Sequence, residues 1–253
     1  GSTEVGRRLE QACAATLKRT SMELGGNAPF IVFDDADIDA AVQGALISKY
    51  RNSGQTCVCT NRIFVQDTIH DVFVDKLVAA TAKLKMGNGL DEAVQQGPLV
   101  NEKAVEDVDR LVRLSTESGA QVALGGARSD LGPCYYQPTV LTGITPGMAV
   151  FRNEIFGPVA PVMSFSDEAE AVDLANDTEF GLASYLYTRD IGRVWRVSEA
   201  LDYGMVGVNE GIISNEMAPF GGVKASGSGR EGSKYGIDDY LEIKYILMGG
   251  LDR

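Results

Sequence analysis

The stretch Pro29-Phe30-Ile31-Val32-Phe33-Asp34-Asp35-Ala36-Asp37 decides the fold that this sequence predicts. Its first five residues form an apolar run that is typical of a buried β-strand. The carboxylates that follow stand where a helix would begin, and they suit the positive end of its dipole. The helical pattern then continues to about residue 51. A buried strand that leads into a helix is the repeating unit of a parallel sheet.

The same alternation continues on both sides of this stretch. Strands are predicted at residues 19–24, 61–66, 121–124, 159–165, 182–187, 205–208 and, with a half-exposed pattern, 240–247. Helices are predicted at residues 4–16, 68–85, 101–118 and 191–200, with one more from an N-cap at Ser166 to about residue 176. Residues 125–138 are rich in glycine and proline and are expected to be irregular. Strands alternating with helices indicate an α/β fold with a mostly parallel sheet and helices on both faces.

Composition excludes several kinds of active site. His70 is the single histidine, so a zinc site built on several histidines is impossible and a Cys-His or Ser-His-Asp arrangement would need this one residue. His70 stands in a polar stretch that opens a helix, and we expect a surface role for it. The four cysteines lack paired C-x-x-C spacing, so no metal site is expected.

Charge and hydropathy limit the classes of binding partner that this protein can have. The net charge of −12 argues against nucleic acid or an anionic membrane, because both need a basic face on the protein. No apolar run approaches the roughly 20 residues of a membrane helix. Four cysteines in 253 residues suggest a reducing compartment. We therefore expect a cytoplasmic protein, or one of the mitochondrial matrix in a eukaryote, that acts on a small molecule.

Two short stretches could carry covalent chemistry. Cys57 lies in Asn52-Ser53-Gly54-Gln55-Thr56-Cys57-Val58-Cys59, a small polar turn between a helix and a strand. Glu23 stands just before two glycines. A thiolate can attack a carbonyl carbon while a carboxylate moves a proton or activates water. The alternatives are a buried structural cysteine and an ordinary surface glutamate.

Several other residues are weaker candidates by themselves. Arg51, six residues before Cys57, could hold a substrate carboxylate or only balance the end of its helix. Cys59 could share a face with Cys57 and form a strained, reversible disulfide, or could be a packing residue. The glycine turn at residues 1–6 could bind pyrophosphate at a helix N-terminus. Glu154 is unremarkable in its local sequence.

Taken in order, these stretches resemble the motifs of the aldehyde dehydrogenase superfamily. The resemblance covers the whole chain and rests on residues 1–7, 23–26, 54–57, 154–158, 219–222 and 226–231. Within the superfamily, the chain looks most like the succinate-semialdehyde dehydrogenase group, through residues 25–30, 49–59, 211–216 and 231–236. The resemblance implies a catalytic domain at residues 25–224, after a remnant of the dinucleotide-binding domain at 1–24. A C-terminal tail with an oligomerisation strand would occupy 225–253.

The resemblance also implies roles for individual residues. Cys57 would add to succinic semialdehyde to give a thiohemiacetal, and Glu23 would activate the water that hydrolyses the thioester to succinate. NAD or NADP would be the cofactor, held by Gly1, Ser2, Glu154 and Phe156. Arg51 and Ser214 would hold the far carboxylate of the substrate. Cys59 would be a redox partner of Cys57, and the protein would be a homo-oligomer.

The resemblance further implies that the front half of a full member, with most of its dinucleotide fold, precedes the position of Gly1. We therefore expect this chain alone to turn over far more slowly than a complete enzyme, because losing even one oxyanion donor costs ~2.7–4 kcal/mol of transition-state stabilisation. Three alternatives stay open: another aldehyde dehydrogenase of the superfamily, a non-catalytic oligomerisation fragment, and a cofactor-free thiol hydrolase that uses Cys57 and Glu23.

Overall fold

The apolar run that opens the sequence argument forms β2 (Ala28–Val32), which is completely buried near the middle of a seven-stranded sheet. The computed structural model describes residues 1–252. The strand order is β4-β5-β6-β3-β2-β7-β8, and every pair is parallel except β4 with β5. The other strands of this sheet are β3 (Thr60–Gln66), β4 (Gln121–Leu124), β5 (Thr139–Thr142), β6 (Val159–Phe165), β7 (Ala183–Tyr187) and β8 (Met205–Val208). The predicted mostly parallel sheet is confirmed.

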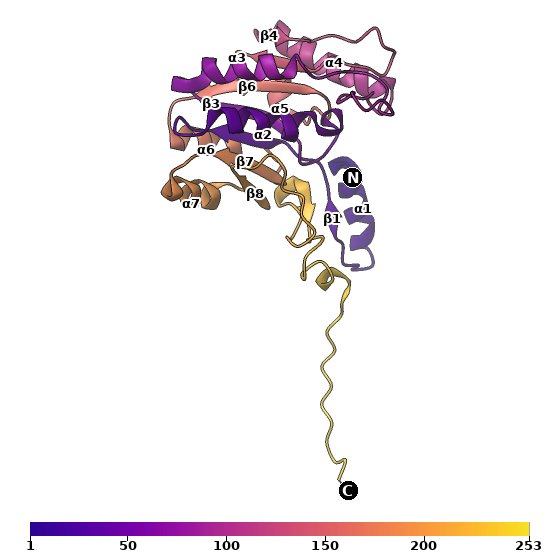
Figure 1. Ribbon diagram of the computed structural model, residues 1–253. Helices are drawn as coiled ribbons and strands as arrows, with labels where there is room; N and C mark the ends of the chain where they lie inside the picture. Colours follow the sequence, from indigo (N-terminus) through magenta and orange to yellow (C-terminus); the bar gives the residue numbers. More distant parts are fainter. Residues whose placement is uncertain (253) are drawn as a thin grey trace.

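Helices cover both faces of the sheet (Figure 1). The helices that cover it are α2 (Ile38–Tyr50), α3 (His70–Thr81), α4 (Glu102–Glu117), α5 (Ala149–Arg152), α6 (Glu168–Asn176) and α7 (Ile191–Ala200), whereas α1 (Thr3–Ala14) lies apart from them. Successive side chains of a strand point to opposite faces. In β2, Phe30 and Val32 pack with α2 and α3, whereas Ile31 packs with α4 to α7. The N-cap of α6 is Asp167 and not Ser166, because the Asp167 carboxylate accepts from the Glu170 amide.

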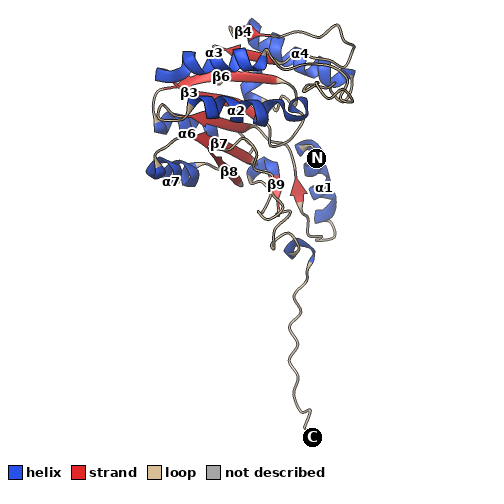
Figure 2. Cartoon of the chain, in the orientation of Figure 1, coloured by secondary structure: helices blue, strands red, loops and turns tan. Residues whose placement is uncertain are grey.

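Two segments far apart in the sequence form a second, small sheet. β1 (Met22–Glu23) pairs antiparallel with β9 (Gly227–Ser228), and α1 lies beside them, to one side of the main sheet (Figure 2). The strand predicted at residues 19–24 is thus shorter than expected and does not belong to the main sheet. The predicted division at residues 24/25 and 224/225 stays a prediction.

The strand predicted at residues 240–247 does not form within the described part of this chain, and an oligomerisation strand in the tail stays a prediction. A short 3-10 turn covers Asp238–Tyr240, and the segment after it extends away from the molecule (Figure 1). Ile243 is completely exposed. A strand needs a neighbour for its backbone donors and acceptors, and no described strand pairs with this segment. The last residue of the predicted tail, Arg253, lies outside the described residues.

No helix in the described part of the chain is long and apolar enough to cross a membrane.

Candidate active site

The candidate site lies where the amino ends of three adjacent strands meet. Cys57 precedes β3, Gly26 precedes β2, and Glu154 precedes β6, and these strands are neighbours in the sheet. A cavity of about 590 Å³ opens at this edge. Its lining residues are Gly1, Ser2, Glu23, Leu24, Gly25, Gln55, Thr56, Cys57, Glu154 and Phe156. One cavity therefore contains the predicted thiol, both predicted carboxylates and all the predicted cofactor residues.

An unusual turn carries the cysteine. Asn52, Ser53 and Gly54 have φ angles of 50°, 54° and 78°, a left-handed run that is costly for the two residues with side chains. Side chains hold the turn in place: Ser53 Oγ donates to the carbonyl of Gly97 (3.0 Å), and Gln55 Oε1 accepts from the amide of Val100 (2.8 Å). A side chain at Gly54 would meet the carbonyl of residue 157 at 2.1 Å. The turn is therefore fixed against the segment that follows Glu154.

Gly26 lies between Cys57 and Glu154 and is in contact with both residues. Its amide donates to Glu154 Oε1 at 3.0 Å. A Cβ atom at this position would lie 2.2 Å from the carbonyl oxygen of Cys57, far closer than two such atoms can approach. The residue must therefore be glycine, because the backbone of the cysteine turn passes directly over it.

Glu23 is free to act on a proton or a water molecule. Its Oε1 atom is buried and has no hydrogen-bond partner within residues 1–252. A buried acceptor without a partner is costly unless a water molecule or a substrate group occupies the space beside it.

Two groups in the cavity have raised pKa values. Burial and, after it, the neighbouring carboxylates of Glu23 and Glu154 together raise the pKa of the Cys57 thiol to about 12. Burial likewise raises the pKa of Glu154 to about 7, against the opposing effect of its hydrogen bond from Gly26. Shifts of this size from burial and charge are common at functional sites.

Alkylation of Cys57 tests these shifts. Only the thiolate reacts, so the rate with iodoacetamide should rise steadily across the alkaline range without a plateau near neutral pH. Glu154→Gln should speed the reaction above pH 7, because the charge that raises the thiol pKa is then absent. Peptide mass spectrometry resolves each cysteine, and Cys134 in the same sample is the control. A Cys57 rate that levels off near neutral pH, or that Glu154→Gln leaves unchanged, would contradict this account.

The cavity fits a nicotinamide dinucleotide in its chemistry. Ser2 is the N-cap of α1, whose first-turn amides point toward the end of the helix where Gly1 and Ser2 line the cavity. Such an end favours phosphate groups. Glu154 Oε2 accepts no hydrogen bond from any described residue and can receive one from a hydroxyl group. The ring of Phe156 is 43% exposed and is held in a left-handed backbone conformation (φ 51°), where it offers a flat apolar surface.

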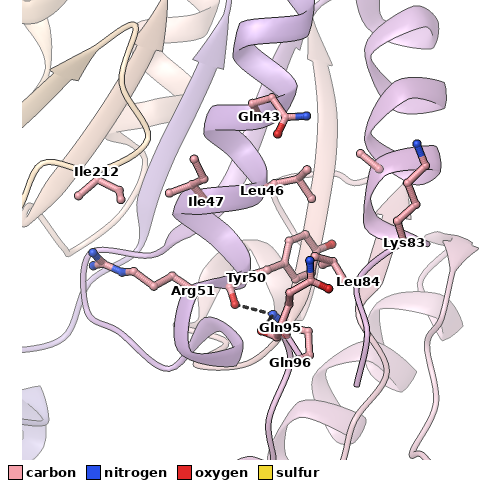
Figure 3. A pocket seen from close by; sticks show the side chains of 11 residues that line it. Gln43, Leu46, Ile47, Tyr50, Arg51, Lys83, Leu84, Gln95, Gln96 and Ile212 are labelled. Carbon is pink, nitrogen blue, oxygen red and sulfur yellow. Dashed lines mark hydrogen bonds between the residues drawn. The ribbon is translucent and has the colours of Figure 1, made fainter. Parts of the chain in front are cut away.

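The predicted substrate-binding residues line different cavities. Arg51 follows α2 and lines a neighbouring cavity of about 570 Å³, in which its guanidinium group extends toward Ile212 (Figure 3). Ser214 is exposed and lines a third cavity, to which Ile212 also contributes. Arg51 forms no ion pair with any of residues 1–252, so its charge is available. The structure does not bring Arg51 and Ser214 into the cavity of Cys57.

Two further residues that the sequence singled out, Cys59 and His70, do not line the cavity of Cys57. Cys59 is buried, its thiol is free, and its sulfur donates to the carbonyl of Arg51 at 3.8 Å. The structure therefore contains no Cys57–Cys59 disulfide, and a redox role for Cys59 stays a prediction. His70 begins α3, where Nδ1 lies 2.9 Å from the Asp71 carboxylate, and it does not line the cavity of Cys57.

A group of buried polar residues next to the site was not predicted from the sequence. Asn27, Asn61 and Arg62 are 1%, 3% and 1% exposed, and hydrogen bonds link them (2.6–3.2 Å). Lys49 is also buried, and burial lowers the pKa of its amine to about 8, opposed by the nearby charges of Cys59 and Glu154. The sequence does carry one signal for this group: polar residues stand at the beginning of β3, directly before its apolar residues.

Comparison with known proteins identifies the family. The chain matches the aldehyde dehydrogenase family over residues 1–246 and belongs to it. It is 61% identical over 251 residues to glutarate-semialdehyde dehydrogenase of Pseudomonas aeruginosa. The aligned region covers 99% of this chain and 52% of that relative. It is 59% identical over 249 residues to succinate-semialdehyde dehydrogenase (NADP(+)) GabD of Escherichia coli, covering 98% of this chain and 52% of that relative.

The fold agrees with this assignment. The crystal structure of succinate-semialdehyde dehydrogenase from Burkholderia pseudomallei superposes with a TM-score of 0.96 at 62% identity, covering 97% of this chain and 51% of that chain. The predicted family and fold class are therefore confirmed. The chain spans about half the length of the curated relatives it matches.

Proposed function

We propose that the protein with this chain oxidises succinic semialdehyde, or a closely related aldehyde with a distant carboxylate, to the corresponding acid with NAD or NADP. The observation that carries this proposal is the single cavity that contains Cys57, Glu23, Glu154 and the N-cap of α1. A nucleophile, a free carboxylate and a helix end that suits phosphate are the parts that such a reaction needs.

Cys57 is the nucleophile in this proposal. Its sulfur adds to the aldehyde carbon and the carbonyl oxygen takes up a proton, which gives a thiohemiacetal. The high pKa of the thiol means that its own proton must leave as the sulfur attacks, either to the nearby Glu23 carboxylate or to water. A high pKa also makes the thiolate a strong nucleophile once it has formed.

The cofactor would lie with its phosphates at Ser2 and with a ribose hydroxyl donating to Glu154. When bound, the nicotinamide would supply the acceptor for the hydride of the thiohemiacetal carbon, and loss of the hydroxyl proton to water would leave a thioester on Cys57. Glu23 then takes a proton from water, whose oxygen attacks the thioester carbon and releases the acid and the free thiol. Its unpartnered, buried Oε1 atom supports this role.

The proposed substrate carries a second negative charge. Arg51 supports this choice because it begins the 3-10 turn Arg51–Gly54, just ahead of Cys57 in the chain, and has no carboxylate partner within residues 1–252. The names of two relatives describe aldehydes of this kind, glutarate semialdehyde and succinate semialdehyde. An arginine binds a carboxylate through two parallel hydrogen bonds, which a neutral aldehyde cannot form.

The test is reduction of nicotinamide cofactor by the full-length protein, with NAD and NADP supplied separately. Succinic semialdehyde is compared with butanal, which has the same carbon chain without the carboxylate. We expect turnover that requires Cys57 and that favours the charged aldehyde by about 10–100-fold in kcat/KM, and we expect Arg51→Ala to remove most of this preference.

Cys57→Ala is the control for the nucleophile in this test. Turnover that survives Cys57→Ala would reject the thiol mechanism. Equal kcat/KM values for the two aldehydes would reject the substrate class and leave the reaction class standing.

We further propose that the protein is a homo-oligomer. Leu241, Ile243, Tyr245 and Leu247 are exposed along the extended tail, and apolar surface of this kind usually lies against another chain. Sedimentation velocity compares the intact protein with a version that ends at residue 240, which should be the smaller assembly. An unchanged assembly would reject a role for the tail.

A further inference from the structure

One buried amide brackets Glu154 from both sides. Asn61 Nδ2 donates to the carbonyl of Asn153 at 2.9 Å, and Asn61 Oδ1 accepts from the amide of Ile155, also at 2.9 Å. These are the residues immediately before and after Glu154. The side chain of Asn61 therefore holds both peptide groups that set the position of Glu154.

Asn61 is itself oriented by Asn27. Asn61 Nδ2 donates to Asn27 Oδ1 at 2.6 Å, and Asn27 Nδ2 donates to the carbonyl of Phe151 (3.0 Å) and to Thr178 Oγ1 (3.2 Å). The guanidinium group of Arg62 donates to the Asn27 carbonyl through Nε and Nη2 (3.2 and 2.9 Å). Every polar atom of the Asn27 and Asn61 side chains thus has a partner, which is what makes burying them tolerable.

The two ends of Glu154 are fixed to one short segment of chain. The carboxylate accepts from the amide of Gly26, and the backbone is held through Asn61 by Asn27, the next residue. The backbone of Gly26 also touches the carbonyl of Cys57. The position of the carboxylate relative to the nucleophile therefore depends on residues 26, 27 and 61 together. Apolar residues would fill these buried positions at lower cost if packing were the only need.

We infer that Asn61 and Asn27 are positioning residues that hold the Glu154 carboxylate at the distance from Cys57 and in the orientation that binding of a cofactor ribose requires. This inference rests on the proposed function for its cofactor, but the effect of Glu154 on the Cys57 thiol can be measured without any cofactor.

The structure provides a matched control in Asn176. Its Nδ2 donates to the carbonyl of Ala200 (2.8 Å) and its Oδ1 accepts from the amide of Asp202 (2.9 Å), so it brackets Leu201 as Asn61 brackets Glu154. Asn61→Ala and Asn176→Ala each remove one bracketing pair of hydrogen bonds, and Asn61→Ala also removes the hydrogen bond to Asn27, but only Asn61→Ala acts on a residue of the cavity. Asn27→Ala removes the hydrogen bond that orients the Asn61 side chain, and it is the variant to test if Asn61→Ala does not fold.

The first readout is the dissociation constant of NAD and of NADP, measured by isothermal titration calorimetry on the full-length protein. We expect Asn61→Ala to weaken binding about tenfold and Asn176→Ala to change it less than about twofold. In the Glu154→Gln background, Asn61→Ala should add less than about twofold, because its effect passes through Glu154. The KM for the aldehyde should stay unchanged. Equal effects of Asn61→Ala and Asn176→Ala, or full effects in the Glu154→Gln background, would overturn the inference.

The second readout needs no cofactor. Above pH 7 the displaced carboxylate should raise the thiol pKa less, so Asn61→Ala should speed alkylation of Cys57 by iodoacetamide in the same direction as Glu154→Gln. Asn176→Ala should not. Failure of the wild-type protein to bind either cofactor would reject the proposed function alone, and the alkylation rates would still decide the role of Asn61. An unchanged rate in Asn61→Ala would overturn the inference.

Discussion

Replacing Glu23 by glutamine is expected to give a protein that oxidises about one aldehyde per site and then nearly stops. The amide fits the same space but cannot take the proton of the attacking water, so the thioester on Cys57 should accumulate. Formation of that thioester should persist, because loss of the Glu23 charge lowers the pKa of the thiol. General-base catalysis is worth about 10²–10⁴-fold, and we expect the steady-state rate to fall by that amount.

Stopped-flow absorbance of the reduced nicotinamide separates the two steps. Glu23→Gln should show a burst of one reduced cofactor per site followed by a slow phase, and mass spectrometry should find the acyl group on Cys57. Glu117→Gln is the control, because that glutamate is paired with Arg113 on the exposed face of α4. A full steady-state rate in Glu23→Gln would show that another group activates the water. Loss of the burst as well would assign Glu23 to deprotonation of the thiol.

The periodicity of the sequence was enough to predict most of the sheet. β2, β6 and β7 are mostly apolar and buried, and burial of this kind leaves a clear pattern. Local pattern is not enough where pairing depends on distant residues. β1 is two residues long and exists because β9, some two hundred residues later, lies beside it. β5 (Thr139–Thr142) was missed because it directly follows the irregular segment at residues 125–138, so no boundary marks its start.

The candidate site could be predicted only in part, for a related reason. Cys57 and Glu23 are recognisable as motifs, and Glu154 and Phe156 as parts of a family pattern. Glu23 lies near the end of the strand predicted at residues 19–24, but that strand belongs to the small sheet, and the site lies at the amino ends of β2, β3 and β6. In open parallel sheets ligands usually bind at the carboxyl ends. This exception depends on three connections that meet in space, which no local pattern contains.

Replacing Gly26 by alanine is expected to inactivate the site without unfolding the protein. The new Cβ atom would lie 2.2 Å from the carbonyl oxygen of Cys57, and this oxygen is backbone, so no side-chain rotation can relieve the contact. Either the cysteine turn or the start of β2 must move by about an ångström. The hydrogen bond from the Gly26 amide to Glu154 would be strained by the same movement. A misplacement of 1 Å can cost about 10²-fold in rate, and we expect a loss of at least that size in kcat/KM.

Gly147→Ala is the matched control, because a Cβ atom at Gly147 would have no neighbour within 4 Å. It should keep its activity within about twofold, as surface substitutions without such contacts usually do. Circular dichroism should show both variants folded, and the rate of Cys57 alkylation should change only in Gly26→Ala. Wild-type activity in Gly26→Ala would mean that the turn can move away from β2 without cost. The left-handed run at Asn52 and Ser53 argues against such freedom, because the hydrogen bond from Ser53 to Gly97 holds this turn in place.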